Sequence, residues 1–593
     1  MSMTGHLLPM VLLRAVAVVA GIAAAIYWRA HEPGYGWLFW GWVICLAAYI
    51  GSFPPALRRE RPIARPAWVL FVGILGLAAV LRFPDIYSVP GNISIDELLP
   101  GLEALHITQG GKPNVFGSIG WFTIPNLTFA IPAVIMQLTP LSPFHALRLS
   151  SALTGLAGIL STFLLCRRLL GTRAALATSF FMSVGFWHLH NSRTGFPYPQ
   201  SSFGPSLVLY LLVRAQQDHS RLLMAAAGVV CGLALQLYFP VRILLLLCPL
   251  FMAGDWMSVR LSWRGALQQS AIFSVGVLLA LAPLVASVPL DSLTMHSRDV
   301  LITRPAVRLT LERRYAVTSL QDVVAGSLAE ATRMFTQWAD VAVLNRSPQG
   351  LLDRGTLAML LAGVVLVLLQ GRAYPLLLLL WGVVTLLFGV ALSDAPRASY
   401  RLAAAMPAIY MLAGFAVDRA LQATEAPQRW YRLTIRPLIL LALAAWVAHE
   451  NYQSFFERYS RDGDGKLPPW PAAMRFLASQ CDGRRFYFVP KADLLSESET
   501  LDLFCSDHSA IEATDIPQRV DTSRPATFIV MAQQFATLNL LNRCYPTGHI
   551  NQHQGPNGLP LFTSMDVDIP ALLDGPKNCQ TPRPTEDGSR QPT

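Results

Sequence analysis

The chain has few charged residues. Only 14% of its 593 residues are Asp, Glu, Lys or Arg, whereas soluble domains contain about 25%. Acidic residues are the scarcer kind, because 36 Asp and Glu stand against 46 Lys and Arg, for a formal net charge of +10. This composition argues against an ordinary soluble enzyme.

Several motifs that carry chemistry are also lacking. The sequence has no Walker A loop, no dinucleotide-binding glycine fingerprint and no GxSxG nucleophile elbow. ATP-driven transport and serine hydrolysis therefore lose support. No series of acids runs through the apolar segments, as a proton-coupled transporter would tend to require.

Hydrophobic residues make up 53% of the chain and fall in long runs. Runs of about 20 residues match a bilayer core of about 30 Å. We therefore predict a polytopic α-helical membrane protein. Its thirteen expected spans lie near 7–28, 36–53, 67–83, 145–165, 172–188, 201–214, 222–238, 240–253, 270–288, 356–370, 374–392, 401–418 and 437–449.

The basic residues gather in short loops between the apolar runs. One cluster is Arg58, Arg59, Arg61 and Arg65, which the positive-inside rule places in the cytoplasm. Topology thus explains most of the positive charge, and nucleic acid is excluded as a partner. The apolar stretch 121–138 would break the alternation of sides, so we expect it to lie in the outer interface within a long first external loop, 85–144.

Three regions follow from this topology. Residues 1–66 hold two N-terminal spans and a basic cytoplasmic loop, 67–449 hold the main transmembrane domain with a second external loop at 289–353, and 450–593 form an external C-terminal domain. Within that domain, 486–490 and 527–531 predict buried strands and 471–480 an amphipathic helix, so it is a small α/β unit. Its end, from about Gly575, is expected to be disordered.

Half of the eight cysteines lie in the C-terminal domain: Cys481, Cys505, Cys544 and Cys579. Four cysteines in an external domain suggest two disulfides in an oxidising compartment. Their spacing does not resemble a CxxC zinc site. The sequence leaves all three pairings open.

The first external loop contains adjacent carboxylates, Asp96 and Glu97. They could cap a helix, because Ser94 and Asp96 are good cap residues and acids favour a helix N-terminus. A partly desolvated carboxylate at a membrane surface could instead act as a general base on an acceptor. Glu103 and His106 follow at helical spacing and could bind the acceptor.

A divalent metal ion is a possible cofactor, with Glu97, Glu103 and His106 as candidate ligands. Two or three oxygen and nitrogen ligands without a supporting motif are common by chance, so no cofactor is certain.

Three later outer turns each combine arginine with tyrosine. Their candidate pocket residues are His190, Arg193, Tyr238, Arg242, Arg397, Tyr400 and Arg401. External arginines run against the positive-inside trend, so we expect an anionic partner such as a phosphate. The alternative is that each arginine pairs with a nearby acid, such as Asp394 or one from 289–353.

These motifs together resemble a known class. The order of an early span, IDE, and a helix ending in HITQGGKP resembles the GT-C integral-membrane glycosyltransferases, and most closely family 39 with the protein mannosyltransferases and lipid A aminoarabinose transferases. The stretch at 146–193, YFPVR at 238–242 and PRASYRLAAAMPAIYMLAG at 396–414 are also similar to family positions. The likeness covers roughly 67–420.

The resemblance implies an inverting transfer of a sugar from a polyprenyl-phosphate donor, within the membrane, to an acceptor outside a bacterial inner membrane. Asp96 would be the general base, with Glu97 beside it positioning the acceptor or a cation. Four arginines would stabilise the phosphate leaving group, namely Arg193, Arg242, Arg397 and Arg401. The acceptor could be lipid, polysaccharide or protein.

One feature departs from the family pattern. Many relatives carry a further acid soon after the motif resembling NSR, where this chain has TGFPYPQ. Asp85, Glu103 or an acid from 289–353 are the available substitutes. A transporter or flippase for an anionic lipid, and a non-catalytic membrane subunit, remain as alternatives, and only the enzyme requires the Asp-Glu pair.

Overall fold

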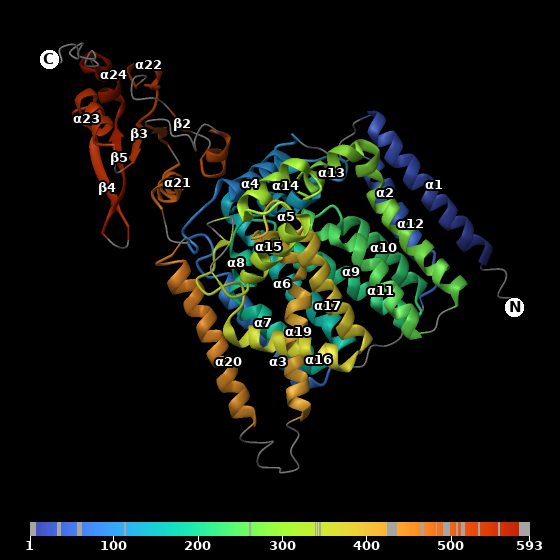
Figure 1. Cartoon of the computed structure of the whole chain (residues 1–593). Coiled ribbons are helices and arrows are strands. Elements are labelled where there is room, and N and C mark those ends of the chain that lie inside the picture. Colours follow the sequence, from blue (N-terminus) through green and yellow to red (C-terminus); the bar gives the residue numbers. More distant parts are fainter. Residues whose placement is uncertain are drawn as a thin grey trace.

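A computed structural model of the chain describes residues 7–31, 37–55, 62–111, 114–259, 262–337, 340, 342, 345–423, 436–463, 468–481, 483–489, 498–505, 508–510, 516–531, 534–555 and 558–579. A helical bundle forms most of it, and a smaller α/β domain projects from one side (Figure 1). Helices α1 (Leu7–His31) and α2 (Trp37–Gly51) lie at the opposite side of the bundle.

The bundle is built from apolar helices of very different length. They are α3 (Arg65–Arg82), α6 (Pro143–Leu169), α7 (Thr172–Val184), α8 (Phe186–Arg193), α9 (Gln200–Gln217), α10 (Arg221–Ala234), α11 (Leu244–Val259), α12 (Trp263–Ser287), α16 (Arg354–Gln370), α17 (Ala373–Thr385), α19 (Met406–Ala423) and α20 (Arg436–Tyr452). Aromatic and aliphatic side chains of α6, α9, α10 and α19 fill the core, while α1 and α3 expose many apolar residues on their outer faces.

Among the described residues, six helices are long and apolar enough to cross a membrane, and five shorter apolar helices accompany them. The chain is therefore a multi-pass membrane protein, as the sequence predicts. The expected number of thirteen spans stays a prediction. The basic residues Arg58, Arg59 and Arg61, on which part of that topology depends, lie outside the described residues.

The stretch expected in the outer interface forms two short 3-10 turns and the nine-residue helix α5 (Ala130–Leu138). Nine helical residues extend only about 14 Å, which is less than half of a bilayer core. Helix α5 packs on α4 (Ile95–Thr108) and α6. The expectation that this stretch lies in the outer interface stays a prediction.

The second large loop is mostly helical. It contains α13 (Leu290–Asp299), α14 (Pro305–Tyr315) and α15 (Leu320–Arg333). Ser319 caps α15 by accepting a hydrogen bond from the backbone N–H of Asp322. Helix α15 packs against the π-helix η5 (Leu386–Ala391) and so lies beside the turn that precedes α18 (Ser399–Leu402).

The C-terminal domain is an α/β unit around a five-stranded sheet of order β2-β1-β3-β5-β4. The strands are β1 (Arg485–Phe488), β2 (His508–Ala510), β3 (Ala526–Met531), β4 (His549–Gln554) and β5 (Pro560–Val567). Strand β1 is parallel to β2 and β3, whereas β5 is antiparallel to β3 and β4. The predicted strands correspond to β1 and β3, and the predicted helix corresponds to α21 (Pro469–Ser479).

Two disulfides join the four cysteines of this domain. Cys481 pairs with Cys505, and Cys544 pairs with Cys579. The other helices of the domain are α22 (Ile516–Arg519), α23 (Phe535–Cys544) and α24 (Ile569–Asn578). The prediction that disorder begins at about Gly575 was wrong, because Gly575 lies within α24. Residues 580–593 lie outside the described residues.

The C-terminal domain contacts the bundle through α4. The turn η10 (Ser498–Leu503) packs on α4, and the rings of Phe504 and Phe144 have centroids 5.2 Å apart. Leu98 and Leu147 belong to the same buried cluster. The Nη2 atom of Arg475, on α21, donates to the carbonyl oxygen of Pro90 at 3.3 Å. The small domain is thus packed against the helix that begins at Ile95.

Candidate active site

Helix α4 begins at the Asp-Glu pair. The hydroxyl of Ser94 accepts a hydrogen bond from the backbone N–H of Asp96 at 3.2 Å, so Ser94 is the N-cap. Asp96 is the second helical residue and its side chain reaches solvent. Desolvation by the surrounding protein nevertheless raises the pKa of Asp96 above its usual range. A solvent-accessible carboxylate with a raised pKa is suited to accept a proton.

Glu97 has a different environment from its neighbour. Its side chain is fully buried and forms an ion pair with Arg148, with Nε donating to Oε1 at 2.8 Å. The same oxygen accepts a hydrogen bond from the backbone N–H of Gly195 at 2.6 Å. A side chain at Gly195 would come within 2.7 Å of Leu147, so this close approach requires glycine.

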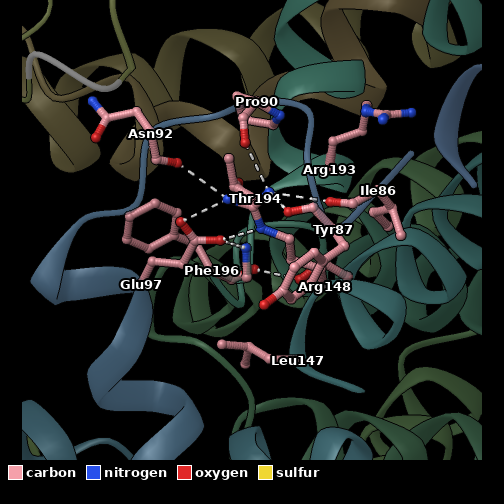
Figure 2. Close-up of polar contacts among 12 residues, drawn as sticks. Ile86, Tyr87, Pro90, Asn92, Glu97, Leu147, Arg148, Arg193, Thr194 and Phe196 are labelled. Atoms are coloured by element: carbon pink, nitrogen blue, oxygen red, sulfur yellow. Dashed lines mark hydrogen bonds and ion pairs between the residues drawn. The ribbon is translucent and has the colours of Figure 1, made fainter. Parts of the chain in front are cut away.

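Arg148 holds the loop that leads to α4. Besides Glu97, its guanidinium donates to four backbone carbonyls in the segment before Asp96 (Figure 2). They belong to Ile86, Tyr87, Pro90 and Asn92, at 2.9 to 3.2 Å. Arg148 is fully buried, so these bonds form away from water, where an unmet polar group costs most.

The expected role of Glu97 in binding an acceptor or a cation requires correction. Both of its oxygens are bonded to Arg148, and no part of the side chain is exposed. Its contacts instead link α4, α6 and the turn after α8. We therefore describe Glu97 and Arg148 as a pair that positions Asp96.

Arg193 also differs from expectation. Its guanidinium donates to the carbonyl oxygens of Leu81, Pro84 and Val89 at 2.7 to 3.1 Å, and only 1% of the residue is exposed. These bonds fix the end of α3 and the loop after it. A phosphate would have to displace them, so we do not keep Arg193 as a donor-binding residue.

The outer turns do converge on one aromatic cluster. The Tyr198 ring stacks on Phe196 at 4.5 Å between centroids and on Tyr400 at 5.6 Å. The ring centroids of Tyr238 and Tyr198 lie 5.5 Å apart. Ala104 of α4 belongs to the same buried cluster as Phe196, Tyr198 and Tyr238, and Asp96 has a minor electrostatic effect on both tyrosines. The structure thus brings α4 together with the turns near 198, 238 and 400.

The other three arginines have separate partners. Arg401 donates to Asp394 at 2.5 Å and lies 5.6 Å above the Tyr400 ring. The Nε of Arg397 lies 3.8 Å from Oε2 of Glu330, on α15. Both contacts match the alternative that the arginines pair with nearby acids.

Arg242 donates to the carbonyl oxygen of Leu293 at 2.8 Å, in α13. Arg401 borders the tyrosine cluster, since it lies over the Tyr400 ring and also interacts electrostatically with Tyr238.

The remaining predicted residues are dispersed. Glu103 accepts a hydrogen bond from the backbone N–H of Trp121 at 2.8 Å, and His106 lies half-buried in the last turn of α4. His190 is buried and lies 3.0 Å from the hydroxyl of Tyr459, in the segment after α20. Within the described ranges, no three His, Cys, Asp or Glu side chains are grouped as metal ligands would be. Glu97, Glu103 and His106 accordingly form no metal site there.

Sequence reasoning missed two charged residues of this region. Arg148 lies inside an apolar helix, and a buried charge in such a helix is a signal that could have been used. Asp340 follows α15 and is buried, with its carboxylate accepting hydrogen bonds from the backbone N–H groups of Ala342 and Ser399 at 2.9 and 3.0 Å. Nothing in the sequence indicates that Asp340 lies beside Tyr400.

Solved structures provide the comparison. ArnT from Cupriavidus metallidurans, solved with undecaprenyl phosphate bound, is similar over 85% of this chain and 98% of its own, with 16% identity and a TM-score of 0.51. An oligosaccharyltransferase from Archaeoglobus fulgidus matches 86% of this chain and 77% of its own, with 12% identity and a TM-score of 0.47. No protein-family model matches the chain, and no curated protein matches it.

The apolar helical bundle with its C-terminal α/β domain places the chain among the multi-pass membrane proteins. More particularly, the match to ArnT shows that the chain has a GT-C-like fold, as the resemblance in its sequence implies.

Proposed function

We propose that the protein is a glycosyltransferase that moves a sugar from a polyprenyl-phosphate donor to an acceptor outside the cytoplasm. The observation that carries this proposal is the position of Asp96, an accessible carboxylate at the start of α4, the helix that packs on the tyrosine cluster through Ala104. The GT-C-like fold supports it, and ArnT, which shares that fold, was solved with undecaprenyl phosphate.

The proposed reaction needs one base and one stabilised leaving group. Asp96 takes the proton of an acceptor hydroxyl or amine while that group attacks the anomeric carbon of the sugar. The bond from this carbon to the phosphate oxygen breaks, and the configuration inverts. The lipid phosphate leaves with the electron pair of that bond. Arg401 would stabilise the growing negative charge by exchanging Asp394 for the phosphate.

The side of the membrane is part of the same proposal. All four cysteines of the C-terminal domain are paired in disulfides, which persist in oxidising compartments. This domain packs on α4, so Asp96 would face the same side. A bacterial inner membrane, with the site on its outer face, fits these features.

Asp96→Asn tests the base. Purified protein would be given undecaprenyl phosphate carrying one of a panel of monosaccharides, with an envelope lipid extract as acceptor. General bases contribute roughly 10²–10⁴-fold, so we expect transfer to fall by about that factor while undecaprenyl phosphate still binds.

Asp291→Asn is the matched control, because Asp291 is likewise the second residue of a helix, α13, and is exposed. It removes a carboxylate from a helix N-terminus without touching the site. Transfer that survives Asp96→Asn would remove the base assignment. A transporter would instead move the intact lipid across vesicles and release no undecaprenyl phosphate.

A further inference from the structure

A small polar cavity lies beside the tyrosine cluster, between the end of α15 and the start of α16. Its lining residues are Met334, Gln337, Asp340, Asn345, Ser347, Gly350 and Leu351. The cavity has room for about one water-sized group. None of these residues takes part in the proton transfer or the phosphate stabilisation described above.

Asn345 is the unusual member of the cavity. Only 4% of it is exposed, and in the described part of the chain its amide meets the full geometry of a hydrogen bond with no group, although it lies close enough to the hydroxyl of Tyr198 to interact with it. Buried polar groups are nearly always bonded, and each unmet group costs about 1–3 kcal/mol. The Tyr198 hydroxyl can engage one of the two amide groups, so the other is available to a polar ligand.

Asp340 provides a second polar group. Two backbone N–H groups orient its carboxylate, and one of them belongs to Ser399, next to Tyr400. Burial raises the pKa of Asp340 to about 6. The Ser399 hydroxyl also bonds this carboxylate, and since a carboxylate has about four acceptor sites, the three groups still leave one free.

The cavity connects to α4 through one tyrosine. Tyr198 is stacked on Tyr400, next to the Ser399 N–H that bonds Asp340, and it shares a buried cluster with Ala104 of α4. A group held by Asn345 would thus lie near Tyr198, which also borders the helix that carries the proposed base. Only a small group that can both donate and accept hydrogen bonds suits an amide beside a carboxylate.

We propose that Asn345 and Asp340 form a subsite for one hydroxyl group of the sugar carried by the donor. This inference rests on the proposed function and adds a determinant of sugar specificity to it. The Asn345 amide would donate to or accept from the hydroxyl, and Asp340 would accept from it. Asp340 is also an acid of the 289–353 loop, one of the substitutes considered for the missing family acid.

The test separates binding of the sugar from binding of the lipid. Affinity of the purified full-length protein is measured for undecaprenyl phosphate alone and for undecaprenyl phosphate bearing a monosaccharide that the wild type transfers. The two variants are Asn345→Leu, in which the new side chain is similar in size and apolar, and Asn345→Ala. Each should weaken the affinity for the sugar-bearing lipid by about tenfold, which corresponds to one hydrogen bond of moderate strength. Affinity for undecaprenyl phosphate alone should not change, which also shows that each variant is folded.

Asn191→Leu is the matched control. Asn191 is equally buried, at 4% exposed, and its amide nitrogen also lacks a partner, but it does not line the cavity. Unchanged affinity of both Asn345 variants for the sugar-bearing lipid would show that the cavity holds only water, and would overturn the subsite while leaving the proposed function intact. If the wild-type protein transfers no sugar from any lipid of the panel, both the subsite and the proposed function are contradicted.

Discussion

Two arginines that are alike in the sequence have different surroundings in the fold. Arg193 is the last residue of α8, Arg401 lies in α18, and both lie near aromatic residues. Arg193 donates to three backbone carbonyls and is buried. Arg401 has one acidic partner, Asp394, and borders the tyrosine cluster. Replacing Arg193 and replacing Arg401 should therefore affect different properties of the protein.

Arg193→Ala should destabilise the protein, because it removes three hydrogen bonds that a buried, charged guanidinium donates, each worth about 1.5–3 kcal/mol. Arg401 is also buried, at 6% exposed, but its acidic partner Asp394 is partly exposed, so Arg401→Ala should destabilise the protein less than Arg193→Ala and should weaken binding of undecaprenyl phosphate. Thermal unfolding in detergent and lipid-binding measurements on both variants check this contrast. Normal stability of Arg193→Ala with lost lipid binding would contradict our correction and return Arg193 to the site.

The raised pKa of Asp96 predicts a pH dependence. A base must be ionised, so kcat/KM should fall as the pH decreases through the pKa of Asp96 in the free enzyme. Because desolvation raises that pKa, the acid limb should lie above the usual aspartate value of about 3.9. A rate profile from about pH 4 to 8 measures it. An acid limb at or below the usual value would show that another group limits the rate.

At the scale of elements, α4 is held from two sides. Arg148 and Glu97 connect it to α6 and to the loop before it. From the other side, η10 of the C-terminal domain packs on α4, and the Cys481–Cys505 disulfide joins the residues that follow α21 and η10. The small domain therefore helps to position Asp96.

The two disulfides allow this role to be tested. Replacing Cys481 and Cys505 by serine should lower kcat several-fold, because η10 loses its link to α21 and α4 is less firmly held. Replacing Cys544 and Cys579 is the matched control, since that disulfide joins the ends of α23 and α24 in a separate hydrophobic cluster. Steady-state transfer kinetics of both double variants give the comparison. Equal losses in the two would indicate general destabilisation of the domain.

At the scale of the whole molecule, the apolar runs and the family resemblance predicted a GT-C-like bundle with a small α/β domain, and both are present. Local signals were sufficient for the Ser94 cap, the strands β1 and β3, and the helix α21. These features depend on neighbouring residues or on simple periodicity, which a sequence displays directly.

Long-range pairings could not be predicted in the same way. Glu97 and Arg148 are 51 positions apart, and the burial that makes them a structural pair arises only when α4 meets α6. Asp340 and Ser399 are 59 positions apart. Charged residues near a membrane surface look equally available in a sequence, so separating Asp96 from Glu97, or Arg401 from Arg193, required the fold.

The central claim is that this chain transfers a sugar from a lipid carrier and that Asp96 does the chemistry. Mass spectrometry of envelope glycolipids and glycans in a deletion strain, complemented with the wild type or with Asp96→Asn, tests it most directly. We expect the deletion to accumulate a polyprenyl-phosphate sugar and to lose the matching sugar from one acceptor, with only the wild type restoring it. An unchanged glycolipid profile in the deletion, or full restoration by Asp96→Asn, would contradict the account.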